Sequence, residues 1–178
     1  MQRILVMTII GADKPGLVDS LAKLVLDHRG NWLESRLSHL GGQFAGILRV
    51  AVPPQEEAAL TSALSALPGL KVMVYPDQVA DQPADRPARI QLLEIIGQDR
   101  PGIVRQISKT LADQGVNVED FQSECASAAM SGESVFKARV TLTLPESCDV
   151  AKLRASLEKI AEDLIVEITL ADLPPGTA

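Results

Sequence analysis

Apolar and polar residues change their period several times along the chain, and each change indicates a new element. Residues 4–10 are apolar and largely β-branched with no helical period, which is typical of a buried strand. From 17 to 25 apolar residues recur on one helical face, and Pro15 stands where a helix start accepts proline. Residues 43–52 alternate, which predicts a strand with one packed and one half-wet face.

This succession of elements occurs twice, because residues 9–18 reappear at 95–104 after a shift of 86 positions. The correspondence continues without a gap as far as Asn31, which falls on Asn117. Beyond that point the shift grows from 86 to 92, which implies an insertion of six residues in the second copy. A match of this extent indicates an internal duplication.

Glycines mark the ends of several elements. Gly41-Gly42 lies in the middle of 31–52, and a pair of glycines supplies the positive φ angles of a tight hairpin turn. Gly30 and Gly115 are predicted to end the first helix of each copy.

A second helix and a last strand complete each copy. Apolar spacing predicts helices at 60–67 and 150–164, and strands at 70–75 and 164–170. The order β, α, β, β, α, β is the ferredoxin-like arrangement, in which two helices cover one face of a four-stranded antiparallel sheet. We therefore predict an α+β fold with two such domains in tandem.

The domain boundaries follow from composition. The polar, proline-interrupted segment 79–88 is predicted to link a first domain at 1–78 to a second at 89–172, and 173–178 is predicted to be a tail. Residues 124–133 are expected to form a long hairpin loop in the second copy, a place where partner contacts are often found.

Charge and composition exclude several classes of protein. A formal charge of −6 and a pI near 4.9 do not favour direct contact with nucleic acid. The apolar stretch near the N-terminus is too short for a signal peptide or a membrane span, so we expect no membrane association and a cytoplasmic location. Cys125 and Cys148 are expected to be ordinary reduced thiols, since neither has a neighbouring Cys or His in sequence.

Catalysis is not expected either. Two histidines and two isolated cysteines do not supply a nucleophile–base pair or a metal cluster, so we predict no catalytic residue, no metal and no cofactor. The repeated loop lacks the Lys-Ser or Lys-Thr of a P-loop and the third glycine of a dinucleotide fingerprint.

The repeated loop Gly-x-Asp-x-Pro-Gly has a chemistry suited to a small ligand. It lies between a strand and a helix start, where backbone N–H groups lack intrahelical acceptors and attract anions. Gly16 and Gly102 have no Cβ, which allows a ligand carboxylate to approach closely. Asp13 and Asp99 add a negative charge nearby. The combination is complementary to a zwitterion such as a free amino acid.

Two asparagines extend this hypothesis, and a simpler interpretation competes with it. Asn31 and Asn117 begin the next strand and offer an amide with donor and acceptor ends. Alternatively, each Asp only caps its helix, and Gly11 and Gly97 only make the turn after the strand. The use of one motif twice in the same topological place favours ligand binding.

These residues resemble the ACT domain, a βαββαβ module that binds amino acids at the loop after its first strand, usually where two modules pair side by side. More narrowly, 11–18, Asn31, 34–37 and 40–41 resemble the glycine cleavage system transcriptional repressor family of tandem ACT proteins. The resemblance covers nearly the whole chain. It implies glycine sensing and control of transcription through a DNA-binding activator, although the residues themselves do not select glycine over serine or threonine.

The resemblance also implies ligand-binding positions in both copies. The positions that the family pattern implies are Gly11, Asp13, Pro15, Gly16, Leu17, Asn31, Gly97, Asp99, Pro101, Gly102, Ile103 and Asn117.

His39, near the hairpin turn, is a separate candidate that the family pattern does not include. A lone histidine in a strand is more often structural.

Another regulatory function remains open. The alternative is an allosteric subunit that binds an amino acid and controls a metabolic enzyme by direct contact. In either case sheet edges and an uncovered sheet face favour pairing, so we predict a homodimer.

Overall fold

The computed structural model divides the chain into two compact units, Met1–Pro83 and Ala84–Ala178. The predicted linker 79–88 lies outside the described residues, as do positions 174–178 of the predicted tail. The structure describes residues 2–77, 89–127 and 133–173.

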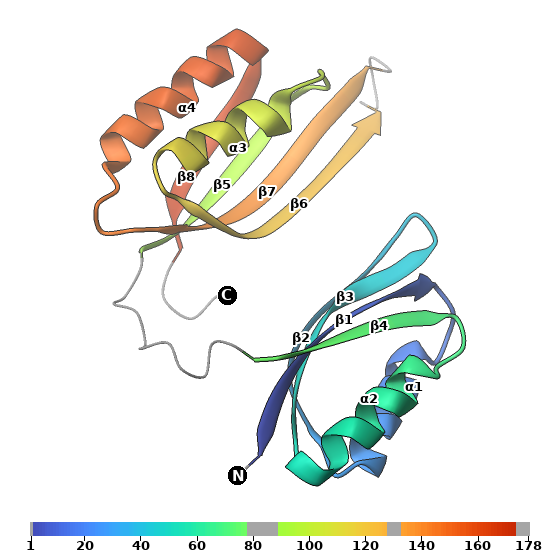
Figure 1. The fold of residues 1–178 in the computed structure, drawn as a ribbon. Coiled ribbons are helices and arrows are strands. Elements are labelled where there is room, and N and C mark those ends of the chain that lie inside the picture. The colour runs from blue at the N-terminus through green and yellow to red at the C-terminus, as the bar shows by residue number, and fades with distance from the viewer. Residues whose placement is uncertain (1, 78–88, 128–132, 174–178) are drawn as a thin grey trace. The chain divides into compact units, whose positions relative to one another are not determined.

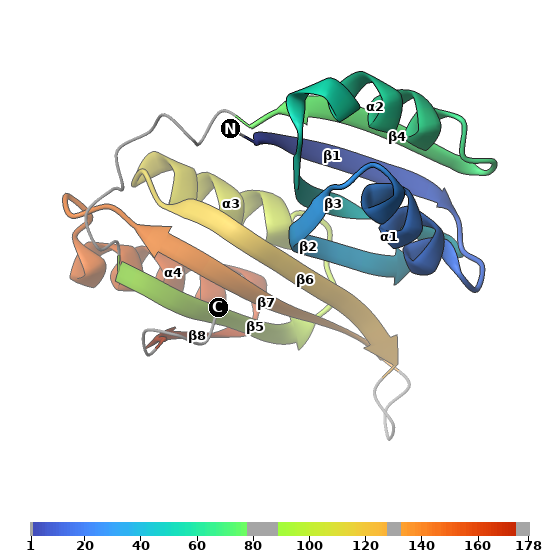
Figure 2. The same ribbon diagram turned by 90° about the horizontal axis from the view of Figure 1, so that it is seen from below.

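Each unit has the predicted β-α-β-β-α-β order, and in each the two helices cover one face of a four-stranded antiparallel sheet (Figures 1 and 2). The strand orders are β2-β3-β1-β4 and β6-β7-β5-β8, which confirms the tandem α+β fold. The first unit contains β1 (Arg3–Ala12), α1 (Leu17–Asp27), β2 (Asn31–Leu40), β3 (Gln43–Val52), a 3-10 turn (Pro54–Glu56), α2 (Glu57–Ser65) and β4 (Leu70–Pro76). The second contains β5 (Arg89–Gln98), α3 (Ile103–Asp113), β6 (Asn117–Ser127), β7 (Ser134–Leu144), α4 (Val150–Leu164) and β8 (Val166–Asp172).

The strand register confirms the duplication and its insertion. Gly11 of β1 pairs with Phe44, and Gly97 of β5 pairs with Phe136, so the first strands are related by 86 positions and the third strands by 92. Gly41 and Gly42 have φ angles of 59° and 76°, which confirms the tight turn between β2 and β3.

Two element ends differ from the sequence prediction. Residues 124–127 continue β6 rather than forming a loop, because their backbones pair with β7 as far as Ser127 and Ser134. Positions 128–132 of that predicted loop lie outside the described residues. The second helix of the first unit ends at Ser65, so Leu67 follows it instead of belonging to it.

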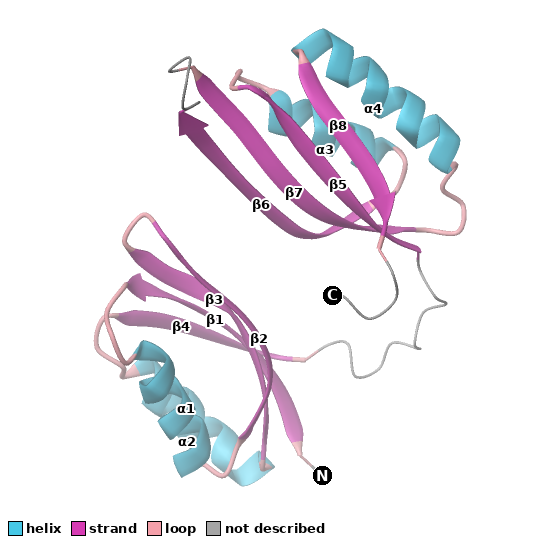
Figure 3. Ribbon diagram, turned by 180° about the vertical axis from the view of Figure 1, so that it is seen from behind, coloured by secondary structure: helices cyan, strands magenta, loops and turns pink. Residues whose placement is uncertain are grey.

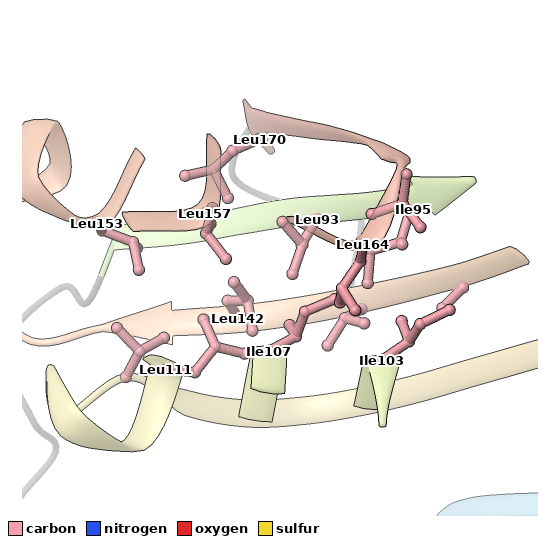
Figure 4. Close-up of a cluster of buried hydrophobic side chains, with 14 of the residues drawn as sticks. Leu93, Ile95, Ile103, Ile107, Leu111, Leu142, Leu153, Leu157, Leu164 and Leu170 are labelled. Atoms are coloured by element: carbon pink, nitrogen blue, oxygen red, sulfur yellow. The ribbon is translucent and has the colours of Figure 1, made fainter. Parts of the chain in front are cut away.

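The core of each unit lies between the sheet and its two helices (Figure 3). In α1 the residues Leu17, Leu21 and Val25 are buried, and this spacing of four places them on one helical face. Ile103, Ile107 and Leu111 do the same in α3, where they meet leucines of α4 and the central strand (Figure 4). Among the described residues, no helix combines the length and the apolar content that crossing a membrane requires.

Both first helices end in a Schellman turn, with the left-handed residue at equivalent positions. In α3 this residue is Gly115 (φ 69°), as predicted. In α1 it is Arg29 (φ 56°), and the predicted Gly30 follows it, donating its N–H to the oxygen of Val25 at 2.7 Å. The prediction for Gly30 was therefore displaced by one residue.

Arg29→Gly is expected to stabilise the first domain by about 1 kcal/mol, because glycine has no Cβ to strain a left-handed backbone. Urea unfolding followed by the fluorescence of Trp32, the single tryptophan, which packs against this core, measures the effect. The reverse change Gly115→Ala is the matched control; it is expected to destabilise the second domain, which has no tryptophan, so its unfolding is followed by circular dichroism. A lower urea midpoint for Arg29→Gly would contradict the assignment.

A buried glutamine in the second domain depends on an aspartate at the end of the sheet. Gln91 is 1% exposed and donates from Nε2 to Asp172 Oδ1 at 2.7 Å. Arg89 donates to both oxygens of the same carboxylate at 2.9 Å. The Arg89 hydrogen bond, followed by that of Gln91, lowers the pKa of Asp172 from 3.8 to about 2.

Because the pKa of Asp172 is lower in the folded chain, its contribution to stability is complete above pH 4 and is lost as the pH falls through about 2. Asp172→Asn is therefore expected to flatten the pH dependence of stability in this window. Urea unfolding of both proteins followed by circular dichroism tests this point. Parallel curves for the two proteins over that range would refute the assigned role of the carboxylate.

Candidate functional site

The candidate site is the corner between the first strand and the first helix of each domain, residues 11–17 and 97–103. In each corner the loop is tied to the neighbouring hairpin by one backbone hydrogen bond. The N–H of Asp13 donates to the oxygen of Gly42 at 3.0 Å, and that of Asp99 donates to the oxygen of Ser134 at 2.9 Å. The two corners thus have the same backbone construction.

The helix starts carry no side-chain cap. Gly16 and Gly102 are the N-cap residues, with φ angles of 88° and 100°, and in the described part of the chain neither helix start has a side-chain capping hydrogen bond. A Cβ placed on Gly16 would meet no atom within 4 Å, so the space beside this helix start is open. Asp13 and Asp99 are not helix caps, and the simpler interpretation of the motif is therefore wrong on this point.

The aspartate of the first corner faces a histidine. Asp13 Oδ2 lies 3.7 Å from His39 Nε2, and the two side chains are 42% and 57% exposed. Both groups are accessible to a solute, and the carboxylate has no closer ion pair among the described residues. His39, which the sequence favours as a structural residue, is therefore part of the corner.

The aspartate of the second corner faces different groups. Ser134 Oγ donates to Asp99 Oδ2 at 3.5 Å, and Cys125 is close enough for the charge of this carboxylate to affect its thiol. Desolvation and then the charge of Asp99 raise the pKa of the Cys125 thiol, which favours the protonated form. Cys125 pairs with Phe136 as His39 pairs with Phe44, so they occupy equivalent positions. The sequence did contain a signal for Cys125, because the repeat shift of 86 positions places it at the position equivalent to His39.

Four of the predicted ligand positions have a structural explanation of their own. A Cβ on Gly11 would lie 2.1 Å from the oxygen of Gly69, and one on Gly97 would lie 2.6 Å from Cγ1 of Val166. These glycines therefore allow close strand packing. Leu17 and Ile103 are 4% and 2% exposed, so their side chains belong to the core and only their backbone N–H groups can face a ligand.

The structure does not bring the asparagines to the corners. Asn31 pairs with Ala51, which pairs with Ile4, whereas the corner follows Gly11 seven residues further along β1. At 3.3 Å per residue this separation is about 23 Å. Asn117 is equally remote from Asp99, and its Nδ2 donates to Glu119 at 2.6 Å. The prediction that both groups contact one ligand within a single domain is wrong, because β1 and β2 run in the same direction, so the start of β2 lies at the opposite end of the sheet from the end of β1, where the corner begins.

Pro15 and Pro101 are exposed and precede the glycine N-caps. Hollows of about 400 Å³ and 390 Å³ occur in the two domains, but neither is lined by Asp13 or Asp99. The hollow of the first domain includes Gly11, at the start of the corner, but not the aspartate. Within the described residues, no three His, Cys, Asp or Glu side chains come together as a metal site would require.

Comparisons with known proteins agree with the fold and the repeat. Models of the ACT domain match residues 3–73 and 91–141. The glycine cleavage system transcriptional repressor of Escherichia coli is 22% identical over 167 residues, covering 92% of this chain and 86% of the repressor. A UPF0237 protein of Methanopyrus kandleri is 35% identical over 78 residues, covering 43% of this chain and 80% of that protein.

Two crystal structures resemble the whole chain. An unknown protein from Galdieria sulphuraria superimposes with a TM-score of 0.85 and 24% identity, covering 98% of this chain and all of that one. A protein provisionally named glycine cleavage system transcriptional repressor superimposes with a TM-score of 0.69 and 16% identity, covering 97% and 98%. Both structures share the fold of this chain, while the two domain matches show that it belongs to the ACT-domain family, with two copies in tandem, and the similarity to the Escherichia coli protein relates it to the glycine cleavage system transcriptional repressor.

Proposed function

We propose that this protein senses a free amino acid, with glycine as the first candidate, and represses transcription in the cytoplasm through a DNA-binding partner protein. The observation that carries the proposal is the uncapped helix start beside an exposed aspartate, which occurs in both domains.

The two ends of an amino acid have matching groups in this corner. A ligand carboxylate approaches the N–H groups of the first helical turn, where the helix dipole also favours an anion. The open space beside Gly16 admits that approach. The ammonium group pairs with Asp13, or with Asp99 in the second domain, and forms a charge-assisted hydrogen bond. Binding in this manner requires no catalytic group, in agreement with a regulatory rather than an enzymatic role.

The preference for glycine rests on the relationship to the glycine cleavage repressor, which extends over 92% of the chain. Each asparagine lies far from the corner of its own domain. An asparagine therefore contributes to the ligand at a corner only when a neighbouring ACT domain supplies it. Action through a partner agrees with the net charge of −6, which disfavours direct contact with DNA phosphates.

Calorimetric titration with a panel of free amino acids tests the corner. Asp13→Ala and Asp99→Ala are each expected to weaken binding in their own domain by about ten- to a hundredfold, because a charge-assisted hydrogen bond is lost. Asp163→Ala removes an exposed carboxylate at the end of α4 and serves as the matched control, with unchanged affinity expected. If a ligand binds and both corner variants retain its full affinity, the proposed site is wrong.

Affinity capture with the full chain, in the presence and absence of the amino acid that binds, distinguishes the two regulatory roles. Recovery of a DNA-binding activator supports transcriptional repression. Recovery of a metabolic enzyme whose activity then responds to that amino acid supports the allosteric subunit instead, and contradicts the transcriptional proposal.

A further inference from the structure

The two sheets differ on the outer face, which is defined here as the face that points away from the helices of the same domain. In the first domain this face carries four large apolar side chains that are about half exposed. They are Ile10 (48%), Ile47 (53%), Met73 (56%) and Tyr75 (51%). The strand register places Ile47 and Met73 on either side of Thr8, so three strands contribute to one continuous patch.

The equivalent patch of the second sheet is charged. Arg139 and Thr169 flank Glu94, in the places that Ile47 and Met73 occupy around Thr8. Lys137 and Glu167 flank Ile96 in the next row. The two sheets pack against their helices in the same way, but their outer faces differ: the face is apolar in the first domain and charged in the second. An apolar patch that a single domain leaves exposed indicates a binding surface.

We propose that the outer face of the first sheet is a homodimer interface, on which the same face of a second copy stacks. In the arrangement that we propose, a twofold axis runs parallel to the strands between β1 and β3. Stacked sheets lie about 10 Å apart with strand directions within about 30° of each other. The operation places β1 opposite β3 of the second copy and β2 opposite β4 of the second copy. Residues that are paired across the four strands of one sheet form a row, and each row lies opposite the same row of the second copy.

This stacking is self-complementary in size. It places Ile47 opposite Thr8 of the second copy, and Ile10 opposite Ala45 of the second copy, as the register of β1 with β3 requires. In both of these rows a large side chain therefore packs against a smaller one. The twofold symmetry makes each contact occur twice. Alternation of large and small residues is what allows facing layers to interdigitate.

The stacking is also free of opposed like charges. Arg36, level with Ile47, falls opposite Met73 of the second copy, and Lys71 falls opposite Ser38. Arg49 is already engaged within its own domain, since its Nε lies 2.7 Å from Asp77 Oδ2. The cationic side chains at the rim therefore have apolar or neutral residues across the interface.

The same operation on the second sheet is unfavourable. It would place Glu124 opposite Glu167 of the second copy, and it would bury Arg139 and Glu94, which it sets opposite each other, on the two central strands of the interface. Like charges repel across an interface, and the desolvation of an ion pair separated by 3.9 Å offsets most of its attraction. The contrast between the two domains assigns the interface to the first sheet.

The area of the outer face limits how strongly two copies can associate. Four strands at 4.8 Å spacing and seven residues at 3.3 Å give a flat area of about 440 Å² per sheet. Side-chain relief raises the accessible area above this value, which brings the pair close to the total of about 1,000 Å² expected for a specific interface. We therefore expect a reversible dimer with a dissociation constant in the micromolar range.

Sedimentation velocity of the full chain, without ligand and from low micromolar to several hundred micromolar concentration, tests the inference. The wild type is expected to change from monomer to dimer over this range. Met73→Lys faces Arg36 of the second copy and is expected to weaken association at least tenfold through like-charge repulsion. Met73→Glu offers the same arginine an opposite charge and is expected to retain the dimer. Thr169→Lys, at the equivalent position of the second sheet, is the matched control and is expected to dimerise as the wild type does.

Circular dichroism melting of each variant separates loss of folding from loss of association. A wild type that stays monomeric throughout would overturn the inference and would leave the face to a different protein. Equal association of Met73→Lys and Met73→Glu would overturn it as well, because the proposed stacking requires their charges to act in opposite directions. None of these outcomes depends on amino-acid binding, so a failed ligand screen leaves the test intact.

Discussion

The alternation of side chains along the central strand is the constraint on which the rest of each domain depends. In β1, Leu5, Met7 and Ile9 point into the core, which fixes Thr8 and Ile10 on the outer face. A slip of one residue would exchange the two sets, so burial of the core residues specifies the register. The same register places Gly11 against Gly69 and determines where the corner begins. Core, corner and outer face are therefore three consequences of one pattern.

The duplicated domains agree where the backbone requires it and differ where side chains are free to vary. Both corners use a left-handed glycine at the helix start and one hydrogen bond to the hairpin. The position beside the aspartate holds His39 in one domain and Cys125 in the other, so the two carboxylates have chemically different neighbours. If the proposed function holds, a ligand ammonium has different neighbours to compete with at the two corners. Equivalent backbones therefore do not imply equal affinities.

Local patterns predicted most of the fold, because periodicity and glycine positions act over a few residues. The repeat, the βαββαβ order and the Gly41-Gly42 turn all have local signals. The position of Asn31 had none, since its distance from the corner depends on strand direction across the sheet. The left-handed Arg29 was missed because a charged residue carries no mark of that conformation. Cys125 was missed because its contact with Asp99 joins residues far apart in sequence.

The corner and the apolar half of the outer face lie at the same end of the first sheet. Ile10 belongs to the outer face, and Gly11, the next residue, belongs to the corner. The Arg49–Asp77 ion pair lies over the other end of the sheet. A ligand at the corner changes self-association only if its affinity differs between monomer and dimer. Ile10 and Gly11 are adjacent in β1, so the proposed ligand and the proposed second copy would contact neighbouring residues of one strand.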